Sequence, residues 1–249
     1  MDSELCALIT GVNGGVGRSL AEAFDAKGYR VIGTDLGPTA RTSACEFYLS
    51  LDLREIARSD AHALEAFTKL KLMLPDGKLH VLINNAAIQV LGGVDSLSRE
   101  DWADSLNVNL LSAFFLAQGL LENLEKGGGS IINIGSVHSR LTKKGFVSYS
   151  TTKAALDGLT RALAVDLGAR VRVNAINPAA IRTNMLIEGF KGNRDVIAEL
   201  ESKHPTKTIG DPKEVANLAL MIASKDLPFL SGSTITLDGA ISCLLHDLN

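Results

Sequence analysis

The 249-residue chain is 46% hydrophobic, and its 25 Lys and Arg against 28 Asp and Glu leave a formal net charge of −3. This composition belongs to a globular protein of one large domain or two small ones. The near-balanced charge argues against a nucleic-acid partner, and the apolar runs are shorter than the ~18 residues of a membrane span. Residues 1–4 lack the basic start of a signal peptide, so we expect a cytoplasmic protein. The scattered cysteines and histidines predict no metal site.

Short apolar runs alternate along the chain with longer amphipathic segments. The apolar runs predict strands over residues 5–10, 30–35, 46–51, 79–84, 130–136, 171–177 and 233–238. The amphipathic segments predict helices over residues 18–27, 60–74, 99–125, 148–168 and 211–224. Continuous apolar strands that alternate with helices are typical of a parallel sheet covered on both faces. We therefore expect an α/β fold, a Rossmann-like doubly wound parallel sheet with helices on both faces, formed by residues 1–249 as one domain.

A glycine-rich turn, T-G-V-N-G-G-V-G at residues 10–17, separates the first predicted strand from the first predicted helix. Glycine lets the backbone approach a pyrophosphate closely, and a helix N-terminus offers free N–H groups to the phosphates. A purely structural turn is the alternative. The turn predicts cofactor contacts from Gly11, Asn13, Gly14, Gly15, Val16 and Gly17.

Asp35 ends the second predicted strand and is followed by Leu36. A carboxylate at this place accepts hydrogen bonds from the adenosine ribose hydroxyls and repels a 2′-phosphate. The glycine turn and Leu36 offer no basic side chain for such a phosphate, although Arg41 lies close in sequence. We therefore expect both residues to contact the cofactor, and NAD to be preferred over NADP. A loop-capping aspartate is the alternative for Asp35.

Tyr149 and Lys153 are four residues apart in a predicted helix, so their side chains share one face. An ammonium beside a phenol lowers the phenol pKa from about 10 and makes it a useful general acid/base. Ser136 stands thirteen positions before Tyr149, at the end of a predicted strand. A solvated helix face and a strand-end turn are the alternative interpretations.

Six signatures, in this order, resemble the short-chain dehydrogenase/reductase family over nearly the whole chain. They are T-G-x-x-x-G-x-G at residues 10–17, N-N-A-A at 84–87, N-V-N at 107–109, Ser136, Y-S-T-T-K at 149–153 and N-P-A-A-I-R-T at 177–183. The resemblance implies a single-domain enzyme that uses a nicotinamide cofactor on a small alcohol or carbonyl compound.

The resemblance also implies individual roles. The catalytic set would be Asn109, Ser136, Tyr149 and Lys153. Tyr149 would be the general acid/base and Ser136 would orient the substrate oxygen. Lys153 would hold the nicotinamide ribose, and Asn109 would hold a water that relays protons from it. Further cofactor contacts would come from Asp52 and Leu53 at the adenine, from Asn85, Ala86 and Ala87 under the adenosine ribose, and from Pro178, Ile181 and Thr183 at the nicotinamide.

The chain departs from the family pattern at Ala87, Ala179 and Ala240, where glycine is usual. Each exchange adds one methyl group and narrows the freedom of the backbone. We interpret these alanines as tolerated variants, because the catalytic set is complete.

Three segments are expected to line the substrate pocket: residues 89–93, 137–146 and 184–204. The last is amphipathic without strong core patterning, which suits a substrate lid. His138 lies two residues after Ser136 and is a candidate substrate contact, although a surface-loop histidine is the more ordinary interpretation. Lys143 and Lys144 would attract an anionic substrate or simply be solvated.

Apolar residues on the helical stretches that begin near Asp101 and Ser148, such as Phe114 and Leu159, face the sheet or a second subunit. The resemblance implies a homodimer or homotetramer built on these helices, with the apolar tail at residues 241–248 in a second contact.

These observations predict an NAD-dependent dehydrogenase or reductase that moves a hydride between nicotinamide and a secondary alcohol or ketone. A 3-oxoacyl-thioester reductase and a sugar or polyol dehydrogenase are alternatives of the same class. An NAD-dependent epimerase or dehydratase and a non-catalytic NAD-binding protein are alternatives of other classes.

Overall fold

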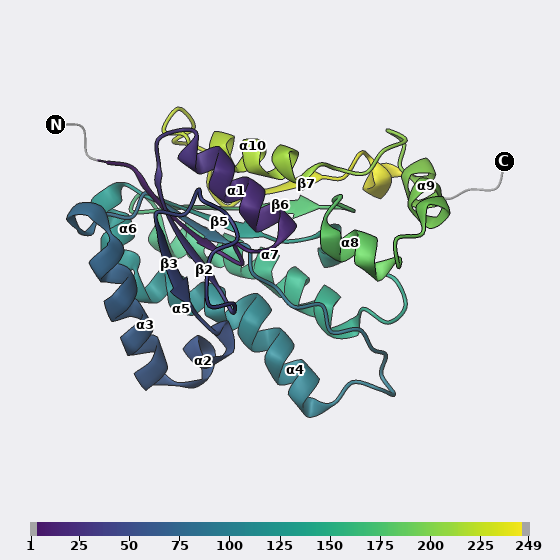
Figure 1. Ribbon diagram of the computed structural model, residues 1–249, viewed down its shortest axis with the longest axis horizontal. Coiled ribbons are helices and arrows are strands. Elements are labelled where there is room, and N and C mark those ends of the chain that lie inside the picture. The colour runs from purple at the N-terminus through teal and green to yellow at the C-terminus, as the bar shows by residue number, and fades with distance from the viewer. Residues whose placement is uncertain (1–3, 246–249) are drawn as a thin grey trace.

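Seven parallel strands form the centre of the molecule in the computed structural model, which describes residues 4–245 (Figure 1). The strands are β1 (Cys6–Thr10), β2 (Arg30–Asp35), β3 (Phe47–Ser50), β4 (Val81–Asn84), β5 (Ser130–Ile134), β6 (Arg172–Pro178) and β7 (Thr234–Leu237). Their order in the sheet is β3-β2-β1-β4-β5-β6-β7. The chain therefore reverses its direction of winding between β1 and β4, which is where a doubly wound sheet binds its ligand.

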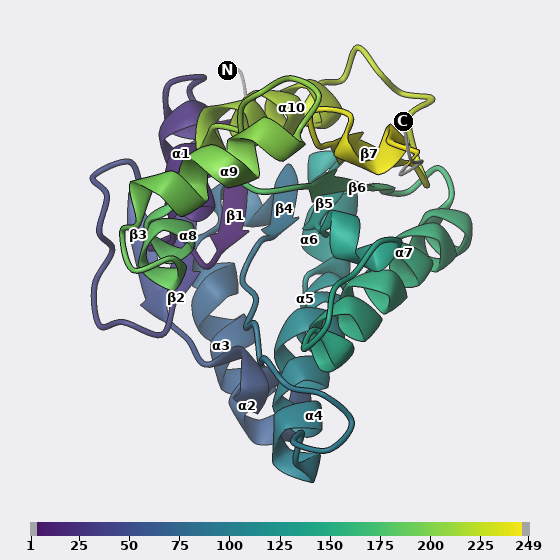
Figure 2. The ribbon, with the colours of Figure 1, turned by 90° about the vertical axis from the view of Figure 1, so that its right-hand side faces the viewer.

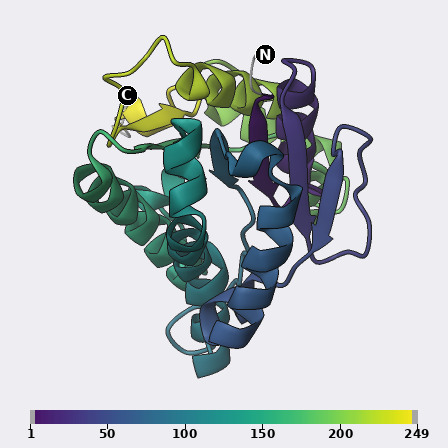
Figure 3. The same cartoon turned by 90° about the vertical axis from the view of Figure 1, so that its left-hand side faces the viewer.

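Helices cover both faces of the sheet, as predicted. The helices α1 (Gly15–Asp25) and α10 (Pro212–Ala223) lie on one face, whereas α3 (Asp60–Met73), α5 (Ser112–Gly119) and α7 (Val147–Leu167) lie on the other (Figures 1 and 3). Successive strand residues point to opposite faces. Leu8 therefore belongs to the apolar core under α3 and α5, and its neighbour Ile9 to the core under α1 and α10.

The remaining helices are shorter. They are α2 (Leu53–Arg58), α4 (Arg99–Leu106), α6 (Leu121–Gly127), α8 (Asn184–Gly189) and α9 (Arg194–Lys203). Figure 2 looks onto the carboxyl edge of the sheet, where α8 and α9 lie on one side and α4 on the other. None of the helices within residues 4–245 combines the length and the apolar character of a bilayer-crossing segment.

The predicted helical stretch over residues 99–125 is confirmed as far as Gly119 and is broken at Leu120. The chain forms α4, a π-helical turn at Asn107–Leu111, α5 and α6. Between the last two helices, Leu120 has φ −111° and ψ 11°, outside the helical region. Apolar periodicity did not reveal this break, because the core side chains continue through it.

Other boundaries also differ from the prediction. The helix α1 begins at Gly15 rather than at residue 18, because the last glycines of the turn form its first turn. The strand β5 ends at Ile134, and Ser136 caps the next short turn. The six-residue helix α2 was not predicted, and the Asp52 side chain caps it by accepting from the Arg54 N–H. The apolar tail is described only as far as Leu245, so residues 246–248 of that prediction lie outside the described part of the chain.

Candidate functional site

The glycine turn between β1 and α1 is held by contacts that leave no room for larger side chains. Gly11 has φ +67°, and a Cβ there would lie 2.8 Å from the Cα of Ala86. A Cβ on Gly17 would lie 2.0 Å from the Gly11 carbonyl oxygen. The N–H groups of Gly15, Val16 and Gly17 have no hydrogen-bond partner within residues 4–245, and the preceding Gly14 provides no side-chain cap. Free N–H groups at the positive end of α1 fit a pyrophosphate.

The carboxylate of Asp35 is fixed at the end of β2 by two backbone donors. It accepts from the N–H of Asn13 at 2.9 Å and from the N–H of Leu36 at 2.7 Å. The Asn13 side chain donates to the Thr39 carbonyl at 3.0 Å and accepts from the Arg41 N–H at 2.7 Å. Asn13 therefore acts as a clamp between the glycine turn and the loop after β2. The Leu36 side chain is 60% exposed beside this carboxylate.

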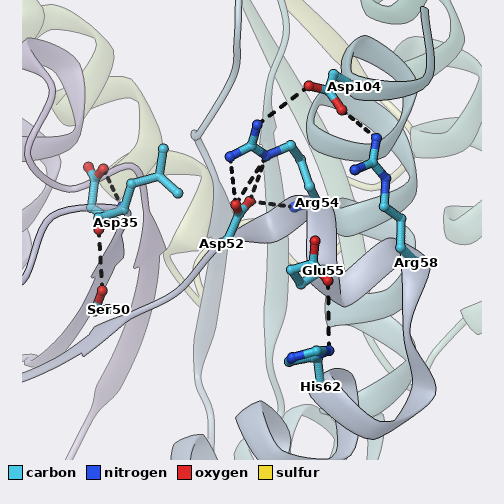
Figure 4. Close-up of polar contacts among 9 residues, drawn as sticks. Asp35, Ser50, Asp52, Arg54, Glu55, Arg58, His62 and Asp104 are labelled. Carbon is cyan, nitrogen blue, oxygen red and sulfur yellow. Dashed lines mark hydrogen bonds and ion pairs between the residues drawn. The ribbon is translucent and has the colours of Figure 1, made fainter. Parts of the chain in front are cut away.

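Asp52, predicted at the adenine, lies in a network of charges at the end of β3 (Figure 4). Its carboxylate accepts from the Arg54 guanidinium at 2.7 Å, and Arg54 and Arg58 both contact Asp104 on α4. The hydrogen bonds from Arg54 lower the pKa of Asp52. Leu53 is buried, so its backbone rather than its side chain is available to a ligand. The sequence did not reveal this network, because the partners on α2 and α4 are about fifty residues apart.

Thr10 ties the loop after β4 to the glycine turn. Its hydroxyl accepts from the N–H groups of Asn85 and Ala86, both at 3.0 Å, and the Asn85 side chain donates to the Thr10 carbonyl at 2.8 Å. The residues predicted to pass under the adenosine ribose, Asn85 to Ala87, therefore begin directly against Gly11.

Tyr149 and Lys153 share one face of α7, as predicted. Lys153 is 2% exposed, and its ammonium donates to the Ile134 carbonyl at 2.7 Å and lies 5.7 Å from the centre of the Tyr149 ring. Burial lowers the pKa of Lys153 to about 8, and the nearby Asp157 carboxylate opposes that shift.

The pKa of Tyr149 moves opposite to the expectation. Burial raises it, and an interaction with the Ser136 hydroxyl opposes the rise. The expectation that Lys153 lowers the pKa of Tyr149 is therefore wrong for the protein without its cofactor. The Lys153 ammonium donates to the Ile134 carbonyl instead of the phenol oxygen, and burial makes its own charged form costly.

Asn109 lies in the π-helical turn, and its side chain is fully engaged with the protein. Its oxygen accepts from the Ile88 N–H at 2.8 Å, and its amide donates to the Ile88 carbonyl at 2.9 Å and to the Thr152 hydroxyl at 3.1 Å. Since Thr152 precedes Lys153, this amide joins the loop after β4 to the helix that carries Tyr149. The water-holding role remains a prediction.

His138 lies on the aromatic side of the site. Its ring stacks on Phe146 with centroids 4.6 Å apart and meets the edge of Tyr149 at 5.8 Å. The Lys143 ammonium lies 4.6 Å from the centre of the Phe146 ring. Burial and Lys143 together lower the pKa of His138, which favours a neutral imidazole. His138 therefore lies within reach of whatever contacts Tyr149.

The residues predicted at the nicotinamide follow β6. Pro178 ends that strand, Ile181 is buried, and the Thr183 hydroxyl caps α8 by accepting from the Leu186 N–H at 3.3 Å. A Cβ on Gly15 would lie 2.8 Å from the Thr183 methyl carbon, so the start of α8 rests on the glycine turn.

The predicted lid segment, residues 184–204, forms α8 and α9. Ile197 and His204 are buried, and the His204 ring nitrogen Nδ1 lies 2.9 Å from the Leu200 carbonyl oxygen. Arg182, just before α8, pairs with Glu201 on α9. The segment therefore packs against the body through few side chains.

A family model described as enoyl-(acyl carrier protein) reductase matches residues 11–242. The chain belongs to the short-chain dehydrogenase/reductase family. Enzymes of this family bind a nicotinamide cofactor and act on CH–OH donors, so the chain is an oxidoreductase.

Three similar proteins support this assignment. An uncharacterized oxidoreductase of Mycobacterium tuberculosis is 35% identical over 95% of this chain and 91% of its own. The structure of the aldohexose dehydrogenase of Thermoplasma acidophilum matches with a TM-score of 0.89, at 26% identity over 99% of this chain and 97% of its own. A 4-hydroxyisoleucine dehydrogenase complexed with NADH matches with a TM-score of 0.86, at 26% identity over 97% of this chain and 100% of its own.

Several residues that shape the site were not predicted for these roles. All are polar side chains inside otherwise apolar segments or next to a known motif, and they are Thr10, Arg54, Thr152, Asp157 and Asn177. A polar residue in a continuous apolar strand, such as Asn177 in β6, is a usable signal because burial requires a partner.

Proposed function

We propose that the protein is an NAD-dependent dehydrogenase or reductase that interconverts a secondary alcohol and its ketone on a small molecule. The observation that carries the proposal is the meeting of Ser136, Tyr149 and Lys153 beside a glycine turn whose free N–H groups fit a pyrophosphate. Hydride transfer needs a proton-transfer group and a dinucleotide-binding turn close together, and here both lie at the same edge of the sheet.

In this proposal, Tyr149 moves the proton of the substrate oxygen and Ser136 orients that oxygen. Lys153 keeps its charge next to the phenol and binds the nicotinamide ribose. Pro178, Ile181 and Thr183 would hold the nicotinamide, which when bound supplies or accepts the hydride. Since burial raises the pKa of Tyr149, the phenol is mostly protonated at neutral pH, and alcohol oxidation should speed up as the pH rises.

The preference for NAD rests on Asp35. Its carboxylate is held in place by Asn13 and Leu36, and a 2′-phosphate would meet this negative charge. The glycine turn carries Gly14 and no basic side chain to balance such a phosphate. The similar 4-hydroxyisoleucine dehydrogenase was solved with NADH, which supports a nicotinamide cofactor, and the choice of NAD rests on Asp35 alone.

A polyhydroxylated substrate, a sugar or polyol, is the favoured class. His138 presents a largely neutral imidazole next to Tyr149, which suits hydrogen bonds to neighbouring hydroxyl groups. The similarity to an aldohexose dehydrogenase points the same way. A 3-oxoacyl-thioester reductase is the second candidate, because Lys143 lies over Phe146 and would attract an anionic carrier, and because the matching family model describes a carrier-linked reductase.

We further propose one catalytic domain over residues 1–249, a lid over residues 184–204, a cytoplasmic location and assembly into a homotetramer or homodimer. The partly buried Phe114, Phe115 and Leu159 on α5 and α7 border the core and support a subunit contact there, whereas Leu116 and Leu163 are buried within the subunit.

The test is a screen for cofactor reduction with NAD and with NADP against sugars, polyols, hydroxy acids and 3-hydroxyacyl thioesters. The proposal expects NADH formation with at least one hydroxyl substrate and a higher kcat/KM with NAD than with NADP. Stronger use of NADP would reject the cofactor choice, and tight NAD binding without turnover would favour the non-catalytic alternative.

A further inference from the structure

Lys153 carries its charge in an unusually buried place. Lys153 is 2% exposed, and among residues 4–245 its ammonium has one hydrogen-bond acceptor, the Ile134 carbonyl oxygen at 2.7 Å. Removing an ammonium from water costs several kcal/mol unless nearby groups compensate. One neutral carbonyl is a weak compensation for a full positive charge, so another group must contribute.

Asp157 lies one helical turn after Lys153 on the same face of α7. It is 5% exposed, which is uncommon for an aspartate. Both of its carboxylate oxygens accept from the side-chain amide of Asn177, at 3.2 and 3.0 Å. The amide supplies hydrogen bonds but no charge to this buried carboxylate.

Three charged groups on the elements packed against α7 have partners other than Lys153. On α4, Asp104 is paired with Arg54 and Arg58, and Asp101 is bound to Ser98 at the start of the helix. On β6, the Arg172 guanidinium binds the Ile222 and Leu230 carbonyls. The titratable and charged residues on the elements packed against α7 are Arg99, Glu100, Asp101 and Asp104 on α4, His138 after β5 and Arg172 on β6. The Asp157 carboxylate raises the pKa of Lys153 against the lowering by burial.

We propose that Asp157 is a positioning residue whose buried carboxylate, held by Asn177, is the counter-charge that keeps the Lys153 ammonium charged and in place. The inference deepens the proposed function and rests on it for the role of Lys153 in catalysis. It adds two supporting residues, Asp157 on α7 and Asn177 on β6, to the four-residue catalytic set.

Asn177 is also held by the segment between β5 and the turn after Ser136. The Asn177 amide also donates to the Ser139 hydroxyl at 2.8 Å, in the turn that follows Ser136. A Cβ on Gly135 would lie 1.9 Å from the Asn177 side-chain oxygen, so glycine at 135 is required for Asn177 to occupy this place. The Asp157 carboxylate is therefore tied through Asn177 to the same segment that positions Ser136.

The test is the titration of Lys153 itself, followed by the carbon-13 signal of its ε carbon in lysine-labelled protein and assigned with Lys153→Met. Asp157→Asn keeps the shape of the side chain and removes its charge. The matched control is Asp166→Asn, which makes the same change at an exposed position of α7. We expect Asp157→Asn to move the Lys153 midpoint down by about one pH unit, equal to about 1.4 kcal/mol, and Asp166→Asn to leave it in place. An unchanged midpoint in Asp157→Asn would overturn the proposal.

A second measurement covers the case in which Asp157→Asn does not fold. The proposal expects Lys153→Met to rescue the Asp157→Asn chain, because the unpaired ammonium is then gone. A double variant that stays unfolded would mean that the carboxylate serves the fold alone, and would also overturn the proposal. Neither measurement uses substrate or cofactor. The role proposed for Asp157 can therefore be rejected while the proposed enzymatic function holds, and the enzymatic function can be rejected while the role of Asp157 holds.

Discussion

Two parts of the site are built in opposite ways. The proposed ribose corner, formed by Asn13, Asp35 and Leu36, joins the glycine turn to the end of β2 and is held by backbone N–H groups. The proposed catalytic wall, formed by Ser136, Tyr149 and Lys153, depends on the burial of Ser136 and Lys153 and on side-chain contacts of α7 with β5 and the π-helical turn. Because the corner is held by backbone groups, it should tolerate changes in the neighbouring side chains. The activity that depends on the wall, by contrast, should be sensitive to single substitutions that change a buried charge or a buried side chain.

The largest expected effect separates the two parts. Tyr149→Phe removes the proton-transfer group and should reduce kcat by about 10²–10⁴-fold, the usual contribution of general acid/base catalysis. The dissociation constant of NAD, measured by calorimetry on the same preparation, should stay within about twofold, because the ribose corner is intact. Unchanged turnover would remove Tyr149 from the mechanism.

The next effect concerns the charge of the wall. Burial lowers the pKa of Lys153 from 10.5 to about 8, so the unfolded chain binds more protons than the folded one between those values. Burial of the charged ammonium therefore lowers the free energy of unfolding by its full amount below pH 8. This loss disappears as the pH rises toward 10.5. Urea unfolding should show wild type gaining about 3 kcal/mol relative to Lys153→Met across this range. If the difference in free energy of unfolding between wild type and Lys153→Met does not vary with pH, burial does not lower the pKa of Lys153.

A smaller effect tests the corner. Asp35→Ser removes the carboxylate that favours ribose hydroxyls and repels a 2′-phosphate, so the ratio of kcat/KM for NAD over NADP should fall by roughly tenfold or more, as expected for hydrogen bonds to a charged group. Asp166→Ser on α7 is the control for the loss of one negative charge. An unchanged ratio would assign the cofactor preference to another residue, with Arg41 the first to examine.

The smallest effect lies outside both parts, at one of the family departures. Ala240 adopts φ +65°, a left-handed conformation that suits glycine. Ala240→Gly should raise the free energy of unfolding by about 1 kcal/mol. The control is Ala179→Gly, since Ala179 has no positive φ and should gain nothing. Loss of stability in Ala240→Gly would contradict the strain argument.

Sequence patterns predicted the strands well because most of them are buried on both sides. The prediction of β2 was correct to the residue, and Asp211 with Pro212 marked the start of α10. The break at Leu120 in the α4–α6 stretch could not be predicted, because apolar residues continue through it. Short, capped helices such as α2 carry too few residues for a periodic signal.

For the site, residue types were easier to predict than their electrostatics. The spacing of Tyr149 and Lys153 predicted their common face correctly, but not that burial would raise the pKa of the phenol. Partners such as Asp157 and Asn177 come from α7 and β6, twenty residues apart, and only the fold brings them together. Their polarity within buried segments was visible in the sequence, whereas their pairing was not.

The most direct test of the central claim is the stoichiometry of cofactor reduction with a substrate found in the screen. Wild-type protein is given excess NAD, and NADH and oxidised product are measured in the same samples. The account predicts one NADH for each molecule of ketone formed, and neither in the Tyr149→Phe protein. Conversion of substrate without net NADH would instead indicate internal use of bound NAD, as in an epimerase or dehydratase, and would contradict the proposed dehydrogenase.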